Sequence, residues 1–258
     1  MATALIASEQ SAYFEWLCRM GDSCLILGHR LSEWCGHGPM LEEDIAIANT
    51  ALDLIGQAQL WLALAAEVQG TGHDADHLAY HRDAGQFRNL LLVERPNGDF
   101  GTTIMRQFLF DTWHLEMLRG LQHSQDARVA AIADKSAKEV AYHLERSADL
   151  IIRLGDGTPQ SHDHLQNALI MLWPYTGELF APDAVDLAMA KANIAPDPAR
   201  LQAGWQATIT QVMEQATLVL PESKFQHLGG KSGKHTEALG YILAEMQFLQ
   251  RAYPNAVW

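Results

Sequence analysis

Carboxylate and imidazole side chains recur at helical spacing in the middle of the chain, and this is the pattern that a protein metal centre requires. Asp111 and His114 stand three residues apart, and Glu139 and His143 stand four apart. Residues at these separations share one face of an α-helix, so each pair could present an oxygen and a nitrogen ligand together. Asp53 adds a further carboxylate within an apolar segment. Such donors suit iron or manganese and the oxidation chemistry of these metals.

The carboxylate-bridged di-iron bundles provide the pattern against which these residues are judged. In those proteins two helices each supply a Glu, and the other two each supply Glu-x-x-His. Asp111-x-x-His114 keeps this spacing. The third residue after Asp53 is Gly56, so the imidazole expected there is missing.

The segment that carries Glu139 departs from the pattern in a different way. The third residue after it is Tyr142, and His143 lies one position further, or about 100° around a helix. We therefore expect a buried network of salt bridges and hydrogen bonds, with no catalytic residue and no metal or other cofactor bound by this chain. The degenerate ligand positions are Asp53, Asp111, His114, Glu139 and His143. The alternative is a di-iron or di-manganese oxidoreductase that uses these same side chains.

Long segments rich in Ala, Leu, Gln, Glu and Met, separated by Gly and Pro, must position these side chains. They predict an all-α protein that forms one domain over residues 1–258. An antiparallel four-helix bundle is expected from residues 8–35, with a break near 21–22, and from 42–68, 101–121 and 127–154. Additional C-terminal helices are expected at 164–180, with a kink at Pro174, and at 198–218 and 236–253.

Composition narrows the classes of function. The 18 Lys and Arg residues against 31 Asp and Glu residues give a net charge of −13, which disfavours nucleic acid and anionic membrane surfaces as partners. The longest uncharged run of the most apolar segment, 54–66, is too short to cross a bilayer. Three cysteines without metal or disulfide spacing, and an N-terminus without a basic signal region, predict a cytoplasmic protein.

Longer motifs extend along nearly the whole chain. They include Leu31-Ser32-Glu33-Trp34-Cys35-Gly36-His37, Asp53-Leu54-Ile55-Gly56-Gln57-Ala58, Pro96-Asn97-Gly98, Asp111-Thr112-Trp113-His114, Lys234-His235-Thr236-Glu237 and Leu243-Ala244-Glu245-Met246-Gln247. In these motifs the chain resembles the C subunits of phenylacetyl-CoA epoxidase, the multicomponent oxygenase of aerobic phenylacetate degradation.

The resemblance implies a ferritin-like fold and a structural, non-catalytic role in phenylacetate catabolism. It implies that the partner is a related A subunit, which holds the di-iron centre and epoxidises phenylacetyl-CoA. A reductase component would deliver the electrons. A free-standing helical adaptor unrelated to oxygenation is a third possibility.

A short polar segment could contact the substrate at the partner interface. Gly85, Gln86, Phe87 and Arg88 place a guanidinium, an amide and an aromatic ring together in an acidic protein. Arginine pairs with phosphate and an aromatic ring stacks on a base, so we expect these residues to approach the CoA part of phenylacetyl-CoA. A solvated turn with local ion pairs is the alternative.

Two further patterns have plainer interpretations. His73, His77 and His81 are spaced as a metal-binding face of a helix would be, but the glycines before them favour a surface loop. The segment 229–235 resembles a phosphate loop only loosely, because its glycine spacing is wrong and His235 stands where Ser or Thr is required. We expect this segment to be a surface loop for partner contact.

Overall fold

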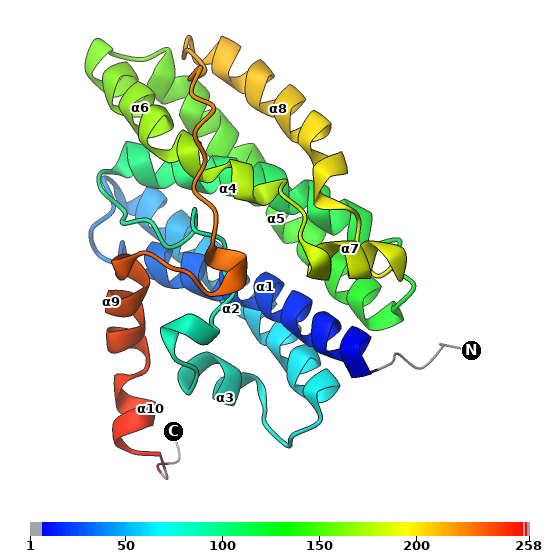
Figure 1. Ribbon diagram of the computed structural model, residues 1–258. Helices are drawn as coiled ribbons and strands as arrows, with labels where there is room; N and C mark the ends of the chain where they lie inside the picture. The colour runs from blue at the N-terminus through cyan, green and yellow to red at the C-terminus, as the bar shows by residue number, and fades with distance from the viewer. Residues whose placement is uncertain (1–6, 255, 257–258) are drawn as a thin grey trace. The chain divides into compact units, whose positions relative to one another are not determined.

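The computed structural model describes residues 7–254 and 256, and it divides the chain into two compact units (Figure 1). The first unit contains the described residues up to Pro96 together with those from Gly229 onward, and the second is Asn97–Leu228. The first unit's helices are α1 Ala7–Ser32, α2 Leu41–Gln69, α3 Ala75–Tyr80, α9 Glu237–Met246 and α10 Phe248–Ala252, with 3₁₀ turns at Ala84–Gln86 and Gly230–Ser232. The second unit's helices are α4 Phe100–Leu121, α5 Ala127–Gly155, α6 Pro159–Leu172, α7 Ala184–Lys191 and α8 Gln202–Gln215, with 3₁₀ turns at Trp173–Tyr175, Gly177–Leu179 and Pro198–Leu201.

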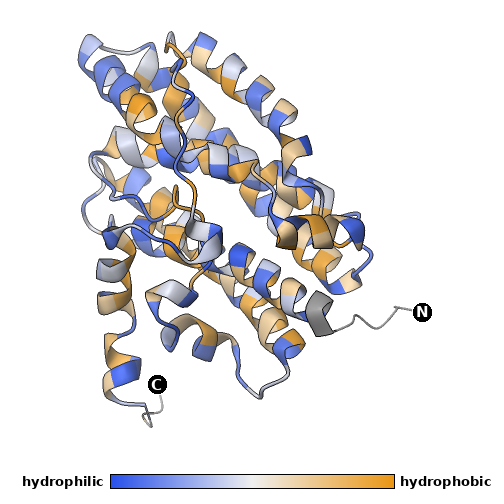
Figure 2. Ribbon diagram, in the orientation of Figure 1, coloured by the Kyte–Doolittle hydropathy of each residue, from blue (hydrophilic) through white to orange (hydrophobic). Residues whose placement is uncertain are grey.

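The core of the first unit is the antiparallel pair α1 and α2. Its close packing depends on small residues: a Cβ added to Gly21 would lie 2.7 Å from the side chain of Leu62. Acidic residues fill the first turn of α2, where they complement the helix dipole, and Gly70 ends the helix in the left-handed conformation at φ 69°. Helix α9, which returns to this unit from the far end of the sequence, is largely hydrophobic (Figure 2).

The second unit is built around α4, whose side chains are buried on nearly all sides. Helices α5, α6 and α8 pack against it. Trp205 of α8 is buried and donates its indole N–H to the carbonyl of Leu109 at 3.0 Å. Helix α5 is strongly amphipathic, so its apolar stripe covers α4 while its polar face meets solvent.

The predicted all-α class is confirmed, since residues 7–254 and 256 contain no strand. The four long helices expected of a ferritin-like bundle are present, as α1 with α2 and as α4 with α5, and additional C-terminal helices follow. The expected interruption of α1 near Gly21 is wrong, because this glycine serves close packing. The predicted kink at Pro174 is present as the end of α6 at Leu172, followed by a 3₁₀ turn. The prediction of a single domain over residues 1–258 concerns how the two units associate and stays a prediction.

Two short helices were not predicted. Helix α3 replaces the loop expected after residue 70, and Asp74 caps it by accepting the backbone N–H of His77. Asp183 caps α7 in the same way, through the N–H groups of Val185 and Asp186. None of the helices in the described part of the chain has both the length and the apolar character that crossing a membrane requires.

Gly21→Ala should destabilise the protein by about 1–3 kcal/mol, because the added methyl group has no room beside Leu62. Gly56→Ala on α2 is the matched control, since nothing lies within 4 Å of its added Cβ. That control should be neutral or stabilising by about 0.5–1 kcal/mol. Urea denaturation of both variants measures the difference, and equal effects would show that α1 and α2 do not need this close approach.

Candidate functional site

The predicted ligand Asp111 lies in a buried polar cluster between α4 and α5. Its side chain is fully buried and accepts hydrogen bonds from Gln107 Nε2 at 2.6 Å and from Ser147 Oγ at 3.0 Å. His114 of α4 and His143 of α5 are buried in the same unit. The carboxylate of Asp111 is thus held by a neutral amide and a neutral hydroxyl.

The electrostatics of this cluster disfavour charge. Burial raises the pKa of Asp111 to about 6, although His143, Ser147, Gln107 and Arg146 oppose the shift. Burial, reinforced by the neighbouring His143, lowers the pKa of His114 to about 3. His114 is therefore a neutral imidazole near neutral pH, and Asp111 ionises only at a cost.

The remaining predicted ligands are less deeply placed. Asp53 on α2 and Glu139 on α5 are both half-buried. Two other polar side chains of α2 lie four residues to either side of Asp53: Asn49 is exposed and Gln57 is buried. Each step of four residues advances about 40° around a helix, so the three side chains turn gradually from solvent toward the core.

These residues do not fit a di-metal centre. Among the residues that the structure describes, no three His, Cys, Asp or Glu side chains form a group that could hold a metal ion. Asp111 and His114 are placed one turn apart as the spacing predicted, but α5 brings Ser147 and His143 to this cluster where a di-iron centre would need carboxylates. The arrangement can keep a proton on Asp111 and can link α4 to α5. It does not offer a set of metal ligands.

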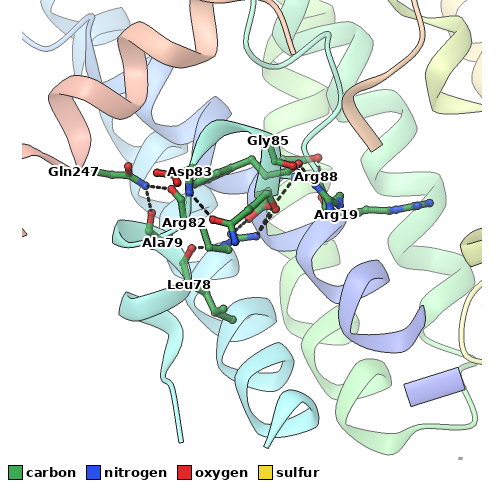
Figure 3. Close-up of polar contacts among 12 residues, drawn as sticks. Arg19, Leu78, Ala79, Arg82, Asp83, Gly85, Arg88 and Gln247 are labelled. Carbon is green, nitrogen blue, oxygen red and sulfur yellow. Dashed lines mark hydrogen bonds and ion pairs between the residues drawn. The ribbon is translucent and has the colours of Figure 1, made fainter. Parts of the chain in front are cut away.

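The first unit contains a second buried network, centred on an ion pair (Figure 3). Arg82 forms a bidentate pair with Asp22, which is fully buried, and its guanidinium lies 4.5 Å from the ring centroid of Phe87. Burial alone lowers the pKa of Arg82, but the charge and hydrogen bonds of Asp22 outweigh it and raise that pKa above its ordinary value. Asp22 also accepts the backbone N–H of Arg88 at 2.8 Å. The ion pair thus fixes the start and the end of segment 82–88.

A third set of contacts joins this segment to the C-terminal part of the chain. His235 places Nδ1 2.8 Å from Glu94 Oε2 and Nε2 3.0 Å from the carbonyl oxygen of Phe87. The Glu94 carboxylate also accepts the N–H of Thr236 at 2.6 Å and the amide of Asn89 at 2.9 Å. A carboxylate and a carbonyl both accept, so the two ring nitrogens of His235 must both carry a proton.

Burial by itself lowers the pKa of His235, but the hydrogen bonds to Glu94 and Phe87, with the charges of Glu94 and Asp22, raise it overall. The side chains of the pair are 4% and 0% exposed. Sequence reasoning missed Glu94 and His235 as partners, because 141 positions separate them. The one available signal was an acidic residue directly after the apolar run 90–93.

The structure separates the residues expected to approach CoA into two groups. Gly85 and Gln86 are exposed and Arg88 is half-buried. Arg88 donates from Nη1 to the carbonyl oxygens of Gly85 and Phe87, each at 2.8 Å. The ring of Phe87 is fully buried beneath Arg82, so a stacking contact between this ring and a base would require it to leave the core.

The three spaced histidines lie along α3 and its flanks, where the sequence predicts a surface loop. Their rings stack, with centroids 3.6 Å apart for His73 and His77 and 5.0 Å apart for His77 and His81. Stacked rings turn their faces to one another, which is a packing arrangement and differs from convergence of the nitrogen atoms on one metal.

Comparison with known proteins identifies a family and a relative that spans nearly the whole chain. The family described as "Phenylacetic acid catabolic protein" matches residues 1–258. The C subunit of 1,2-phenylacetyl-CoA epoxidase from Escherichia coli (strain K12) is 49% identical over 240 residues, which cover 93% of this chain and 96% of that protein.

Asp111→Asn should stabilise the protein by about 1–3 kcal/mol at pH 8, because it removes a buried negative charge. The folded-state pKa of Asp111 lies above the unfolded value, so the wild type recovers this stability as pH falls through about 6 toward 4. The difference in the free energy of unfolding between the variant and the wild type should therefore disappear at low pH. Urea denaturation between pH 4 and 8 measures it, with the exposed Asp134→Asn as control. A loss of stability at pH 8 would mean that a cation compensates the ionised carboxylate.

The His235 and Glu94 pair should make the folded protein less stable as the pH rises above neutral. The folded-state pKa of His235 is raised, so its contribution is complete below about pH 6.5 and is lost as pH rises through the folded value. Glu94→Gln should cost about 2 kcal/mol at pH 6 and progressively less at higher pH. Denaturation from pH 6 to 9 tests this, with the exposed His123→Gln as control. A cost for Glu94→Gln that is constant across this range would contradict a charged His235.

Proposed function

Because the chain belongs to the phenylacetic acid catabolic protein family, we propose that it is the structural, non-catalytic subunit of a 1,2-phenylacetyl-CoA epoxidase. The Escherichia coli relative supports this role across nearly the full length of both chains. The catalytic partner would be a related A subunit that carries the di-iron centre, and a reductase component would supply electrons. The complex would act in phenylacetate catabolism in the cytoplasm.

The composition of the Asp111 cluster is the observation that carries this proposal. A catalytic di-iron subunit needs several carboxylates and two imidazoles around the metals. Here the buried carboxylate is satisfied by Gln107 and Ser147, and His114 is neutral and enclosed. The hydrogen bond from Ser147 joins α5 to α4 and needs no metal, which suits a subunit that supports a partner's centre.

Metal analysis of the purified chain tests the assignment directly. The chain purified alone from cells supplemented with iron and manganese should contain less than about a tenth of an equivalent of either metal. The complex with the catalytic partner should contain iron and should epoxidise phenylacetyl-CoA. About two equivalents of metal in this chain alone, lost on Asp111→Ala, would instead make it a metalloenzyme in its own right.

The N-terminal half of α2 presents a surface that suits a subunit partner. Leu41, Ile45 and Leu52 are 71%, 51% and 67% exposed. On a helix these positions fall within an arc of about 40°, so they form one apolar stripe. Obligate subunit interfaces bury such surface, whereas a lone apolar stripe in water carries a cost.

Ile45→Glu combined with Leu52→Glu should weaken assembly with the catalytic subunit at least tenfold while the chain itself stays folded. Leu187→Glu on α7 is the control, because the side chain of Leu187 is as exposed as that of Ile45, at 51%, and lies on the other unit. Analytical ultracentrifugation of the mixed subunits measures assembly, and circular dichroism checks the fold. Unchanged assembly of the double variant would place the interface elsewhere.

A further inference from the structure

The segment that bears Lys234 lies directly against the segment 85–88, although about 145 positions separate them in the sequence. His235 bonds the carbonyl oxygen of Phe87. Gly233 sits so close to Gly85 that an added Cβ would collide with the Gly85 carbonyl oxygen, and it would lie 2.7 Å from Arg88 Nη1. Lys234 stands between these two anchored residues, so it must lie beside segment 85–88.

The loop that presents this lysine is preformed. The N–H groups of Ser232 and Lys234 both donate to the carbonyl oxygen of Gly229 at 2.9 Å, and Ser232 Oγ donates to the same oxygen. Gly229 and Gly233 have φ values of 148° and 78°, which only glycine adopts readily. A loop closed in this way fixes the backbone position from which Lys234 projects.

Lys234 and Arg88 bring two cationic side chains to this place, in a chain whose net charge is −13, and the exposed Glu237 lies three residues after Lys234. The neighbouring carboxylates already have cationic partners: Asp22 pairs with Arg82, Glu94 with His235, and Asp83 with Arg251. Glu15 pairs with Arg19 at 2.8 Å, and it also forms a longer ion pair with Arg88 Nε at 3.8 Å. Lys234 is exposed, and the Arg88 side chain is 24% exposed.

From this juxtaposition we infer that Lys234, together with Arg88 and the exposed Gly85 and Gln86, binds the phosphate groups of a CoA thioester. Arginine and lysine side chains recognise phosphate, and the exposed side-chain NH2 group of Gln86 adds a neutral donor. The inference rests on the proposed function, since it gives this subunit a share in holding the substrate of the complex. It also replaces the stacking role expected of Phe87 from the sequence.

Calorimetric titration of the assembled complex with CoA and with dephospho-CoA, which lacks the 3′-phosphate, tests the inference. Lys234→Glu should weaken CoA binding about fivefold to tenfold, and raising the salt concentration should weaken the wild type more than the variant. The wild type should prefer CoA over dephospho-CoA, and the variant should lose most of this preference. Lys135→Glu, the same charge change at an exposed position of α5, should bind as the wild type does.

A second variant separates the position of the loop from its charge. Gly233→Ala should also weaken CoA binding, because the added methyl group pushes the loop away from Gly85 while every charge remains. Gly240→Ala on α9, where nothing lies within 4 Å of the added Cβ, is its control.

The outcomes distinguish this inference from the proposed function. An assembled, active complex whose CoA affinity is the same with Lys234→Glu as in the wild type would overturn the inference and leave the proposed function intact. Equal affinity of the wild type for CoA and pantetheine, which lacks the nucleotide, would overturn it as well. A chain that does not assemble with any catalytic subunit would overturn the proposed function itself.

Discussion

The ion pair between Asp22 and Arg82 is the constraint around which the first unit is organised. Asp22 is fully buried in the middle of α1, and a buried carboxylate without a partner would cost several kcal/mol. Arg82 meets this requirement, and Arg88 contributes its backbone N–H. The carbonyl oxygen of Arg82 in turn accepts hydrogen bonds from Gln247, in the turn between α9 and α10, and from Arg251 of α10, as Figure 3 shows for Gln247. Helices from opposite ends of the sequence are thereby fixed to one buried charge.

The second unit deals with a buried aspartate in a different way. Asp111 is as deeply buried as Asp22, but it accepts hydrogen bonds from the neutral side chains of Gln107 and Ser147. The contrast explains why burial raises the pKa of Asp111 to about 6, since an amide and a hydroxyl offset less of the lost hydration than a bidentate guanidinium does. A metal ion would supply further positive charge, yet the described residues around it form no ligand group. The cluster therefore keeps Asp111 and His114 one helical turn apart, and its printed hydrogen bonds come from an amide and a hydroxyl.

The long helices were predictable because their signals are local, while the buried contacts between distant segments were not. Alanine and leucine-rich segments ended by Gly or Pro defined α2, α4 and α5 within a few residues. Local signals failed where a residue has a tertiary role: Gly21 indicated a break, but it makes room for Leu62. The contacts from His235 to Glu94 and Phe87 cross more than 140 positions, and no spacing rule encodes such a pairing. The pair Asp111 and His114 was predictable in position because one helix turn separates them, but its surroundings come from another helix.

The buried polar groups of the first unit bear on the structural role that we propose for this chain. In the first unit the buried groups bind backbone atoms: Glu94 binds the N–H of Thr236, His235 binds the carbonyl of Phe87, and Gln247 binds the carbonyl of Ala79. Such contacts rigidify a surface from below, and they restrict the conformations open to the exposed groups above them. Phosphate recognition gains most from groups held in this way, because a charged contact at a surface is weak when each side chain must first be ordered. The phosphate site that we infer would depend on this rigid scaffold beneath the surface.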